Sequence, residues 1–222
     1  MSDWDLNEVR PRFMKMATTN VSDALDEVGL TNQVAIGVRP VWNCPPICGP
    51  ALTVRNIPAG TKKQVHHGGF VTAHTAKPGD VIVIDNAGDL QNNGWGGIVA
   101  WASKMAGAQG TVVDGAVRDV QDFEEAEYPV YAKGTVPRTA RKRMVQDAIN
   151  TTVRFCGVQV NPGDLVFADR NGIVFVPGGR VLEVLAIAER IWAHEEAMIR
   201  EIRAGRDPLE VDLKHGYEKG LK

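Results

Sequence analysis

The sequence has few of the residues on which several common classes of protein depend. Its 222 residues contain three serines and three cysteines, the latter at Cys44, Cys48 and Cys156. An odd cysteine count does not form a complete set of disulfides, and a structural zinc ion needs about four ligands. We therefore expect reduced thiols near a loop, without a metal or redox role.

Long apolar runs and charge of one sign are also missing. No segment approaches the ~18 apolar residues of a membrane span, and the N-terminus lacks the apolar core of a signal peptide. The net charge is −2, with lysine and arginine dispersed along the chain. These features predict a cytoplasmic protein whose partners are neither membranes nor nucleic acids.

Familiar catalytic motifs are absent as well. The sequence has no P-loop and no G-x-G-x-x-G following a strand. It also has neither the G-x-S-x-G of serine hydrolases nor an H-E-x-x-H zinc motif. Nucleotide binding through these loops, serine hydrolysis and zinc proteolysis are therefore not expected.

What remains is an ordinary globular composition, with 44% hydrophobic and 23% charged residues. Apolar periodicity predicts alternating strands and helices, which define an α/β protein. No linker is evident, so we expect a single domain over 1–222, with an N-terminal helix in 1–19 and a C-terminal helix and tail in 179–222. The expected helices are 6–16, 22–28, 62–76, 98–106, 119–127 and 181–204. The expected strands are 51–54, 81–84, 110–113, 130–132 and 173–176.

One pattern occurs twice. Pro78-Gly79-Asp80 and Pro162-Gly163-Asp164 each precede a run that reads as a buried strand followed by a turn. Shared turn chemistry and a repeated strand unit explain the pattern equally well.

The strongest candidate site follows the strand at 110–113. Arg118 and Asp119 stand where a helix should begin, and Asp122 is three residues further on, which would place both carboxylates on one helical face. Two carboxylates suit a hard cation such as Mg²⁺, and a guanidinium matches a carboxylate ligand. The competing explanation is that acidic residues merely offset the dipole of the helix.

A glycine-rich turn, Gly94-Trp95-Gly96-Gly97, leads into the helix predicted at 98–106. The free backbone N–H groups at the start of that helix could bind a carboxylate.

Together these residues resemble the family of 4-hydroxy-4-methyl-2-oxoglutarate / 4-carboxy-4-hydroxy-2-oxoadipate aldolases and RraA-like regulators of ribonuclease E. The family motif is a glycine, twenty residues, Arg-Asp, two residues and an acid. Gly97, Arg118, Asp119 and Asp122 fill every position. The resemblance implies a layered α/β sandwich with a β-sheet core (a swivelling β/β/α fold), a long C-terminal helix, and assembly as trimers or dimers of trimers.

The resemblance also implies a class II aldolase using Mg²⁺ or Mn²⁺ on a small 2-oxo acid, with oxaloacetate decarboxylation as a side activity. Asp119 would ligate the metal, and Asp122 would act through metal-bound water. Arg118 would contact the pyruvyl oxygens and stabilise the enolate. The N–H groups of Ile98 and Val99, just past Gly97, would hold a substrate carboxylate.

Family members add an acidic residue from a neighbouring subunit, for which this sequence offers Glu195, Glu196 and Glu27.

His66, His67 and His74 could form a metal site or simply be surface and packing residues. Lys62, Lys63, Lys104 and Lys133 lie outside the Arg-Asp motif, so no Schiff-base lysine is expected. The alternative function is a non-enzymatic regulator of ribonuclease E, and the predicted terminal helices favour the aldolase branch.

Overall fold

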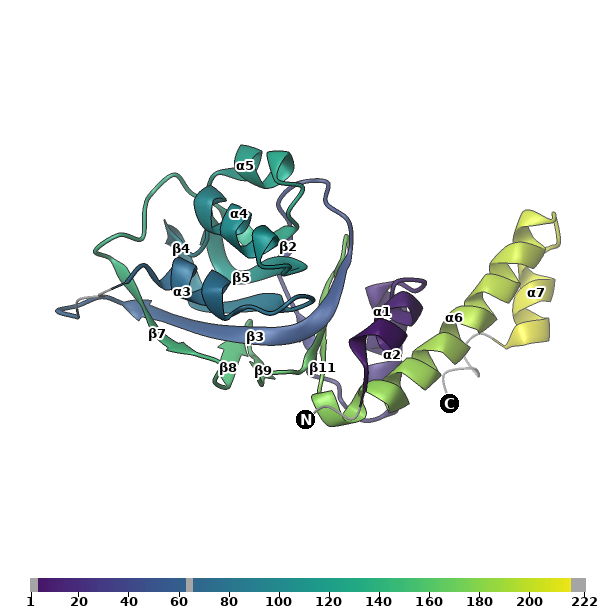
Figure 1. Cartoon of the computed structure of the whole chain (residues 1–222). Coiled ribbons are helices and arrows are strands. Elements are labelled where there is room, and N and C mark those ends of the chain that lie inside the picture. The colour runs from purple at the N-terminus through teal and green to yellow at the C-terminus, as the bar shows by residue number, and fades with distance from the viewer. Residues whose placement is uncertain (1–3, 63–65, 217–222) are drawn as a thin grey trace.

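The computed structural model describes residues 4–62 and 66–216, and in it two β layers lie between two groups of helices (Figure 1). The helices are α1 (Leu6–Phe13), α2 (Thr18–Glu27), α3 (Gly68–Thr75), α4 (Gly97–Met105), α5 (Val120–Glu125), the 3₁₀ turn η1 (Gly178–Arg180), α6 (Val181–Arg203) and α7 (Pro208–His215). The strands are β1 (Val34–Ala35), β2 (Arg39–Pro40), β3 (Ile47–Pro58), β4 (Val81–Asn93), β5 (Gly110–Val117), β6 (Val130–Thr135), β7 (Met144–Ile149), β8 (Val153–Phe155), β9 (Val158–Val160), β10 (Leu165–Asp169) and β11 (Gly172–Val176).

The long strand β3 belongs to both β layers. Its first half pairs antiparallel with β10, and its second half pairs parallel with β4. The strand order of the nine-stranded sheet is β1-β11-β10-β3-β4-β5-β6-β2, with β7 also pairing with β3, and β8 and β9 form a separate two-stranded sheet. Strands β3, β4, β5 and β6 run parallel to one another, so their carboxyl ends share one edge.

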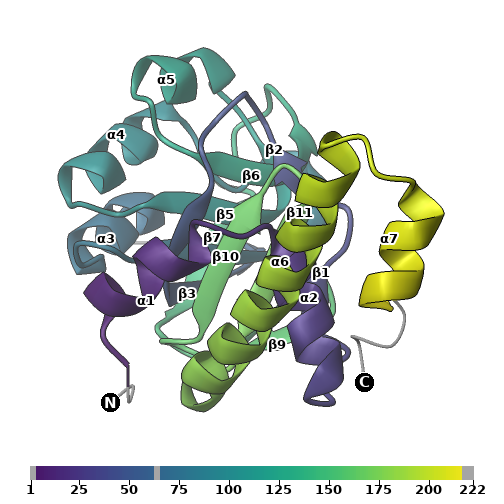
Figure 2. The same cartoon turned by 90° about the vertical axis from the view of Figure 1, so that its right-hand side faces the viewer.

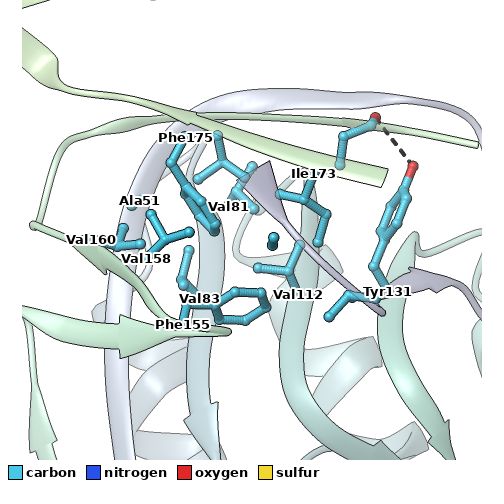
Figure 3. Packing of buried hydrophobic residues seen from close by; sticks show 14 of the residues in the cluster. Ala51, Val81, Val83, Val112, Tyr131, Phe155, Val158, Val160, Ile173 and Phe175 are labelled. Atoms are coloured by element: carbon cyan, nitrogen blue, oxygen red, sulfur yellow. Dashed lines mark hydrogen bonds between the residues drawn. The ribbon is translucent and has the colours of Figure 1, made fainter. Parts of the chain in front are cut away.

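The space between the β layers is filled by the largest apolar cluster, shown in Figure 3. Successive side chains of a strand point to opposite faces of the sheet. Val81 and Val83 of β4 point into this cluster, whereas Ile82 and Ile84 belong to the cluster beneath α4 and α5. The hairpin β8–β9 adds Phe155, whose ring packs edge-on against Phe175 of β11.

The helices α1, α2 and α6 form a layer on the outer face of β10 and β11, and in Figure 2 α6 crosses in front of these strands. We call these three helices the α2–α6 layer. Phe167 and Val176 of the strands meet Phe13, Leu25 and the apolar stripe of α6 in this cluster. The end of α6 carries α7 away from the sheet (Figure 1).

Several elements differ from the sequence-based expectation. Strand β4 continues to Asn93 through two register shifts. The first of them contains Ala87 and Gly88, which adopt left-handed φ angles of 53° and 71°. Part of the C-terminal tail forms α7, and β3 begins at Ile47, before the strand predicted at 51–54. The helix predicted over 62–76 begins only at Gly68, and residues 63–65 lie outside the described part.

The repeated Pro-Gly-Asp pattern reflects turn chemistry. Asp80 accepts a hydrogen bond from the Lys77 amide at 2.8 Å, and Asp164 accepts one from the Asn161 amide at 2.7 Å. The strands that follow differ in their pairing, because β4 runs parallel to β3 and β10 runs antiparallel to it. The two turns are therefore alike, but the strands they begin do not form equivalent units.

No helix among the described residues is both long enough and apolar enough to cross a membrane.

Candidate active site

The glycine turn after β4 is tied to the end of β5 at the shared carboxyl edge of the sheet. The Gly94 amide donates to the Ala116 carbonyl at 2.7 Å, and the Arg118 amide donates to the Trp95 carbonyl at 3.1 Å. These bonds bring together two segments about twenty residues apart in the sequence. Ligand sites of open α/β sheets typically lie at this edge.

Asp119 occupies the N-cap position of α5 in a left-handed conformation, with φ 64° and ψ 46°. Such a backbone is uncommon for a residue other than glycine, although aspartate tolerates it better than most. The side chain makes no capping bond to its own helix. Its Oδ2 atom instead accepts from the Gly97 amide at 3.1 Å and lies 3.3 Å from Nε of Arg118.

Asp122, in the first turn of α5, lies against Gly97. A Cβ atom added to Gly97 would lie 1.9 Å from Oδ2 of Asp122, and one added to Gly96 would lie 2.8 Å from Oδ2 of Asp119. The absence of side chains at both positions is what admits the two carboxylates. We call Gly94–Gly97 and Arg118–Asp122 the acidic corner.

This geometry corrects one expectation. Helix α5 begins at Val120, so Asp119 precedes the helix and does not share a helical face with Asp122. Both carboxylates approach adjacent glycines, and that approach brings them together.

The acidic corner fits a hard divalent cation. Asp119 is 38% exposed, so its carboxylate can be reached from solvent. Mg²⁺ is commonly held by one or two protein carboxylates while keeping several waters. The described residues contain no group of three or more histidine, cysteine or acidic side chains placed to hold a metal, so a cation here would rely on these two carboxylates and non-protein oxygens.

Ile98 and Val99 occupy the first turn of α4, directly after Gly97. Amides in a first helical turn have no intrahelical acceptor, and the N-terminal end of the helix dipole favours an anion. The Ile98 side chain is 73% exposed, while that of Val99 is buried.

A cavity of about 710 Å³ adjoins the acidic corner. Gly94, Trp95, Gly96, Val99 and Arg118 form its wall on the side of the acidic corner. The remaining lining residues come from β3, β4 and residues 59–62, from the start of α3, and from the segment 139–146, which includes the first residues of β7. Sequence reasoning missed that last segment, because it contains no recognisable motif.

The acids expected from a neighbouring subunit lie elsewhere in the chain, in the α2–α6 layer. Glu195 accepts from Nδ2 of Asn20 at 2.7 Å, and Glu27 forms an ion pair with Arg190 at 2.6 Å. Glu196 is exposed. One chain alone therefore does not bring these side chains to the acidic corner.

Glu195 also contributes to raising the pKa of a nearby carboxyl in the α2–α6 layer, that of Asp23. The pKa of Asp23 is raised by burial and by the negative charges of Glu195 and Asp26.

The candidate histidines and Lys133 lie in different surroundings. His66 and His67 line the cavity, whereas His74 lies exposed in α3. Lys133 lies 2.6 Å from buried Asp114. Burial by itself would lower the pKa of Lys133, but its hydrogen bond and charge interaction with Asp114 outweigh that effect and raise the pKa. A lysine held protonated in this way is a poor nucleophile.

The three cysteines are free thiols. Burial raises the pKa of Cys48 and of Cys156 to about 12 in each case, which leaves both poorly reactive.

The fold and the acidic corner define an α/β sandwich with an Arg-Asp-x-x-Asp site at the carboxyl edge of its parallel strands. The chain belongs to the Aldolase/RraA family, whose RraA-like model matches residues 18–175.

One relative, from Halalkalibacterium halodurans, is named "Putative 4-hydroxy-4-methyl-2-oxoglutarate aldolase". It is 35% identical over 86% of this chain and 87% of its own length. Protein DlpA of Legionella pneumophila is 31% identical over 91% of this chain, but the match spans only 33% of that longer protein.

The solved structure of Streptomyces coelicolor RraAS2, described as an unusual member of the RNase ES inhibitor RraA protein family, superposes with a TM-score of 0.77 at 25% identity. The superposition covers 93% of this chain and all of RraAS2.

Proposed function

We propose that the protein is a divalent-metal-dependent pyruvate aldolase. It cleaves a 4-hydroxy-2-oxo acid, such as 4-hydroxy-4-methyl-2-oxoglutarate or 4-carboxy-4-hydroxy-2-oxoadipate, to pyruvate and a second oxo acid. The observation that supports this most directly is the approach of Asp119 and Asp122 to Gly96 and Gly97, beside Arg118 and an open cavity.

The chemistry requires a means of stabilising negative charge. Cleavage of the C3–C4 bond leaves the pyruvate half as an enolate. Asp119 and Asp122 would hold Mg²⁺ or Mn²⁺, and such a cation supplies Lewis-acid stabilisation of that charge. Arg118 adds a fixed guanidinium aimed at the same oxygens, and the amides of Ile98 and Val99 orient the substrate carboxylate. Loss of CO₂ from oxaloacetate yields the same enolate, so we propose decarboxylation as a second activity.

The residue that accepts the proton of the 4-hydroxyl group is proposed to come from another subunit. Within one chain, Asp119 and Asp122 are already the proposed metal ligands, and Asp114 is paired with Lys133. Glu195, Glu196 and Glu27 lie on the α2–α6 layer of the same chain, away from the acidic corner. A cyclic trimer, or a dimer of trimers, would repeat one contact at every interface and could place such an acid beside a neighbour's Arg118.

The test is pyruvate release from a panel of 4-hydroxy-2-oxo acids and oxaloacetate, followed with lactate dehydrogenase. We expect the wild type with Mg²⁺ or Mn²⁺ to release pyruvate and Arg118→Ala to lose at least about 100-fold of that rate. Arg203→Ala, an exposed substitution at the end of α6, is the matched control. A wild type inactive on the whole panel, or full activity in Arg118→Ala, would contradict the proposal.

The competing function is regulation of a ribonuclease, favoured by the likeness to RraAS2. A pull-down against ribonuclease E, run beside the aldolase assay, separates the two. A stable complex that inhibits RNA cleavage, together with no pyruvate release, would establish the regulator.

A further inference from the structure

The cavity beside the acidic corner is lined by positive charge and by no acid. Among the described residues that line it, none is an aspartate or a glutamate. Arg118 belongs to the proposed pyruvyl site, so the other basic side chains have no assigned role. An acid-free wall of this kind favours a ligand that brings its own negative charge. The basic and histidine side chains of the wall are Lys62, His66, His67, Arg118, Arg141 and Lys142.

Arg141 and Lys142 lie on a turn that is fastened at both ends. Before the turn, the Ala140 amide donates to the side chain of Asn93 at 2.7 Å. After it, the Arg143 carbonyl accepts from the amide of the residue that follows β3, also at 2.7 Å. The two cations are therefore presented to the cavity from a fixed piece of backbone.

The charges of these two side chains are not used within the chain. Lys62 is paired with Asp147 at 2.9 Å. Within the described ranges, by contrast, the side chains of Arg141 and Lys142 form no ion pair and no hydrogen bond. Both are exposed among the residues that line the cavity. They can therefore bind an anion without breaking an existing contact.

The start of α3 adds backbone donors to the same cavity. Gly68 and Gly69 occupy the first turn of α3 and line the cavity. Amides of a first helical turn have no intrahelical acceptor, and the N-cap residue, His67, makes no side-chain capping bond. Free amides at the N-terminus of a helix form a site that suits phosphate, because the helix dipole favours negative charge there.

Trp95 supplies a further sign that a ligand belongs in this cavity. It lines the cavity and is 3% exposed, and its indole Nε1 has no hydrogen-bond partner among the described residues. A buried donor left unpaired requires an explanation. A ligand oxygen in the cavity would supply the missing acceptor.

A phosphate monoester matches this set of groups better than a single carboxylate does. It carries about −1.5 to −2 charges at pH 7 and has three strong acceptor oxygens. The two free cations and the two first-turn amides together offer more donors than one carboxylate can accept from. The cavity, at about 710 Å³, also has the size of sites that hold drug-sized ligands. It has room for a chain longer than those of the short diacids named above.

We infer that this cavity is a phosphate-binding subsite, and that the protein accepts 4-hydroxy-2-oxo acids whose distal chain ends in a phosphate. The inference rests on the proposed function, since it places the pyruvyl half at the acidic corner, and it extends the substrate class beyond diacids. Cleavage breaks the C3–C4 bond, passes the proton of the 4-hydroxyl group to the base, and returns a proton to C3. The products are pyruvate and a phosphorylated aldehyde, so the reaction needs no oxidant and no second reactant.

Binding tests the subsite without catalysis. The probes are glycerol 3-phosphate and 3,4-dihydroxybutanoate, which share a diol chain and differ in the phosphate or carboxylate at its end. Calorimetric titration of metal-free protein should show at least about 10-fold tighter binding of glycerol 3-phosphate. The absence of metal prevents either probe from binding through a cation at the acidic corner. The Arg141→Gln/Lys142→Gln double variant should lose most of this preference.

Arg138→Gln is the matched control for the double variant. It removes a positive charge from the same segment, but Arg138 does not line the cavity, so the preference for phosphate should persist. Wild-type protein that binds neither probe, or binds both equally, would overturn the phosphate subsite. A double variant that keeps the wild-type preference would overturn it as well.

A second pair of variants tests the amides of α3. Proline is favoured at the first position of a helix, and His67 already has the extended conformation that precedes proline, with φ −66° and ψ 117°. Gly68→Pro removes one amide donor, whereas Gly68→Ala adds a side chain and keeps the donor. We expect Gly68→Pro to bind glycerol 3-phosphate about 3- to 10-fold more weakly than Gly68→Ala. Equal affinities would contradict the role assigned to α3.

A kinetic arm separates this inference from the proposed function. The substrates are 4,5-dihydroxy-2-oxo-6-phosphooxyhexanoate and its unphosphorylated counterpart, 4,5,6-trihydroxy-2-oxohexanoate. Wild-type kcat/KM for pyruvate release should be at least about 100-fold higher for the phosphorylated substrate. The double variant should lower that value about 10- to 100-fold more than the value for the unphosphorylated substrate.

The two possible failures give different results. Phosphate preference in binding, without pyruvate release from either compound or from the panel of 4-hydroxy-2-oxo acids, would refute the aldolase and leave the phosphate subsite standing. Pyruvate release with equal kcat/KM for the two substrates would overturn the phosphorylated substrate class and leave the aldolase standing.

Discussion

The acidic corner and the α2–α6 layer handle carboxylates in opposite ways. In the acidic corner, Asp119 and Asp122 approach the backbone of Gly96 and Gly97, and Nε of Arg118 lies 3.3 Å from Asp119. In the α2–α6 layer, Glu27 is paired with Arg190, and Glu195 accepts from Asn20. The first arrangement keeps acceptor capacity for a ligand, whereas the second uses that capacity for packing between helices.

This difference separates two kinds of evidence for a site. The acidic corner is assembled from backbone features that no helix needs for its own stability: a left-handed aspartate and two glycines in close contact with acids. The acids of the α2–α6 layer have local partners that account for their positions. Their proposed role in a neighbouring subunit's acidic corner therefore depends on how the subunits assemble. Experiments must separate that role from the packing role within one chain.

The largest loss of activity should come from removing Asp119, the proposed metal ligand that also bonds to Gly97 and Arg118 in the acidic corner. Asp119→Ala deletes the acceptor of the Gly97 amide and the partner of Arg118. We expect a loss of at least about 1000-fold in kcat/KM for pyruvate release, with the circular dichroism spectrum unchanged. Asp207→Ala, which removes the N-cap carboxylate of α7, should keep activity. Similar losses in both variants would point to general destabilisation.

A steric change should disrupt the geometry of the acidic corner without altering any of its charged side chains. In Gly97→Ala the new Cβ would lie 1.9 Å from Oδ2 of Asp122, so that carboxylate must move. We expect activity to fall about 10- to 100-fold and unfolding free energy to fall by about 1–3 kcal/mol. Gly179→Ala, which meets no atom within 4 Å, is the control for both the rate assay and the denaturant titration. Unchanged Mg²⁺ affinity and rate in Gly97→Ala would contradict the proposed role of Asp122.

Subunit mixing tests whether the α2–α6 layer contributes to a neighbour's acidic corner. Asp119→Ala subunits and Glu195→Gln/Glu196→Gln subunits, each inactive alone, are dissociated, mixed and reassembled. Some mixed interfaces then contain both intact groups, and we expect partial recovery of pyruvate release. A fully active glutamine variant, or no recovery despite subunit exchange proven by mass spectrometry, would exclude a shared site of this kind.

The last prediction is that borohydride traps no Schiff base between pyruvate and a lysine of the protein. Borohydride added with pyruvate should leave the protein mass unchanged, because the charge of Asp114 keeps Lys133 protonated and Lys62 is paired with Asp147. Intact-mass spectrometry checks this. A pyruvyl-lysine adduct that accumulates as activity is lost would replace the metal mechanism with a Schiff-base mechanism.

The sequence predicted the α/β class and the long helix α6, and its motif singled out residues that the structure brings together in the acidic corner, because apolar periodicity and motif spacing are local signals. It did not predict the left-handed Asp119, because that conformation is enforced by contacts with Gly97 across twenty-one residues of intervening chain. Strands β7, β8 and β9 were also missed. Strands β8 and β9 have only three residues each, and β7 pairs with the distant β3.

The cavity wall was hidden for the same reason. Arg141 and Lys142 carry no motif. The bonds that join Asn93 with Arg138 and Ala140, and the bond from the Ala59 amide to the Arg143 carbonyl, hold their turn at the cavity. Sequence spacing identifies a site whose parts are fixed by a family motif. It does not reveal which distant turn completes that site.

The most direct test of the central claim is exchange of the methyl protons of pyruvate in D₂O, followed by NMR. It reports enolate formation at the proposed metal site without requiring the correct distal substrate. We predict exchange by wild-type protein with Mg²⁺ or Mn²⁺, loss of exchange after chelation, recovery on adding the metal back, and none in Asp119→Ala. Exchange that persists at full rate in chelated, metal-free protein confirmed by elemental analysis would contradict the account.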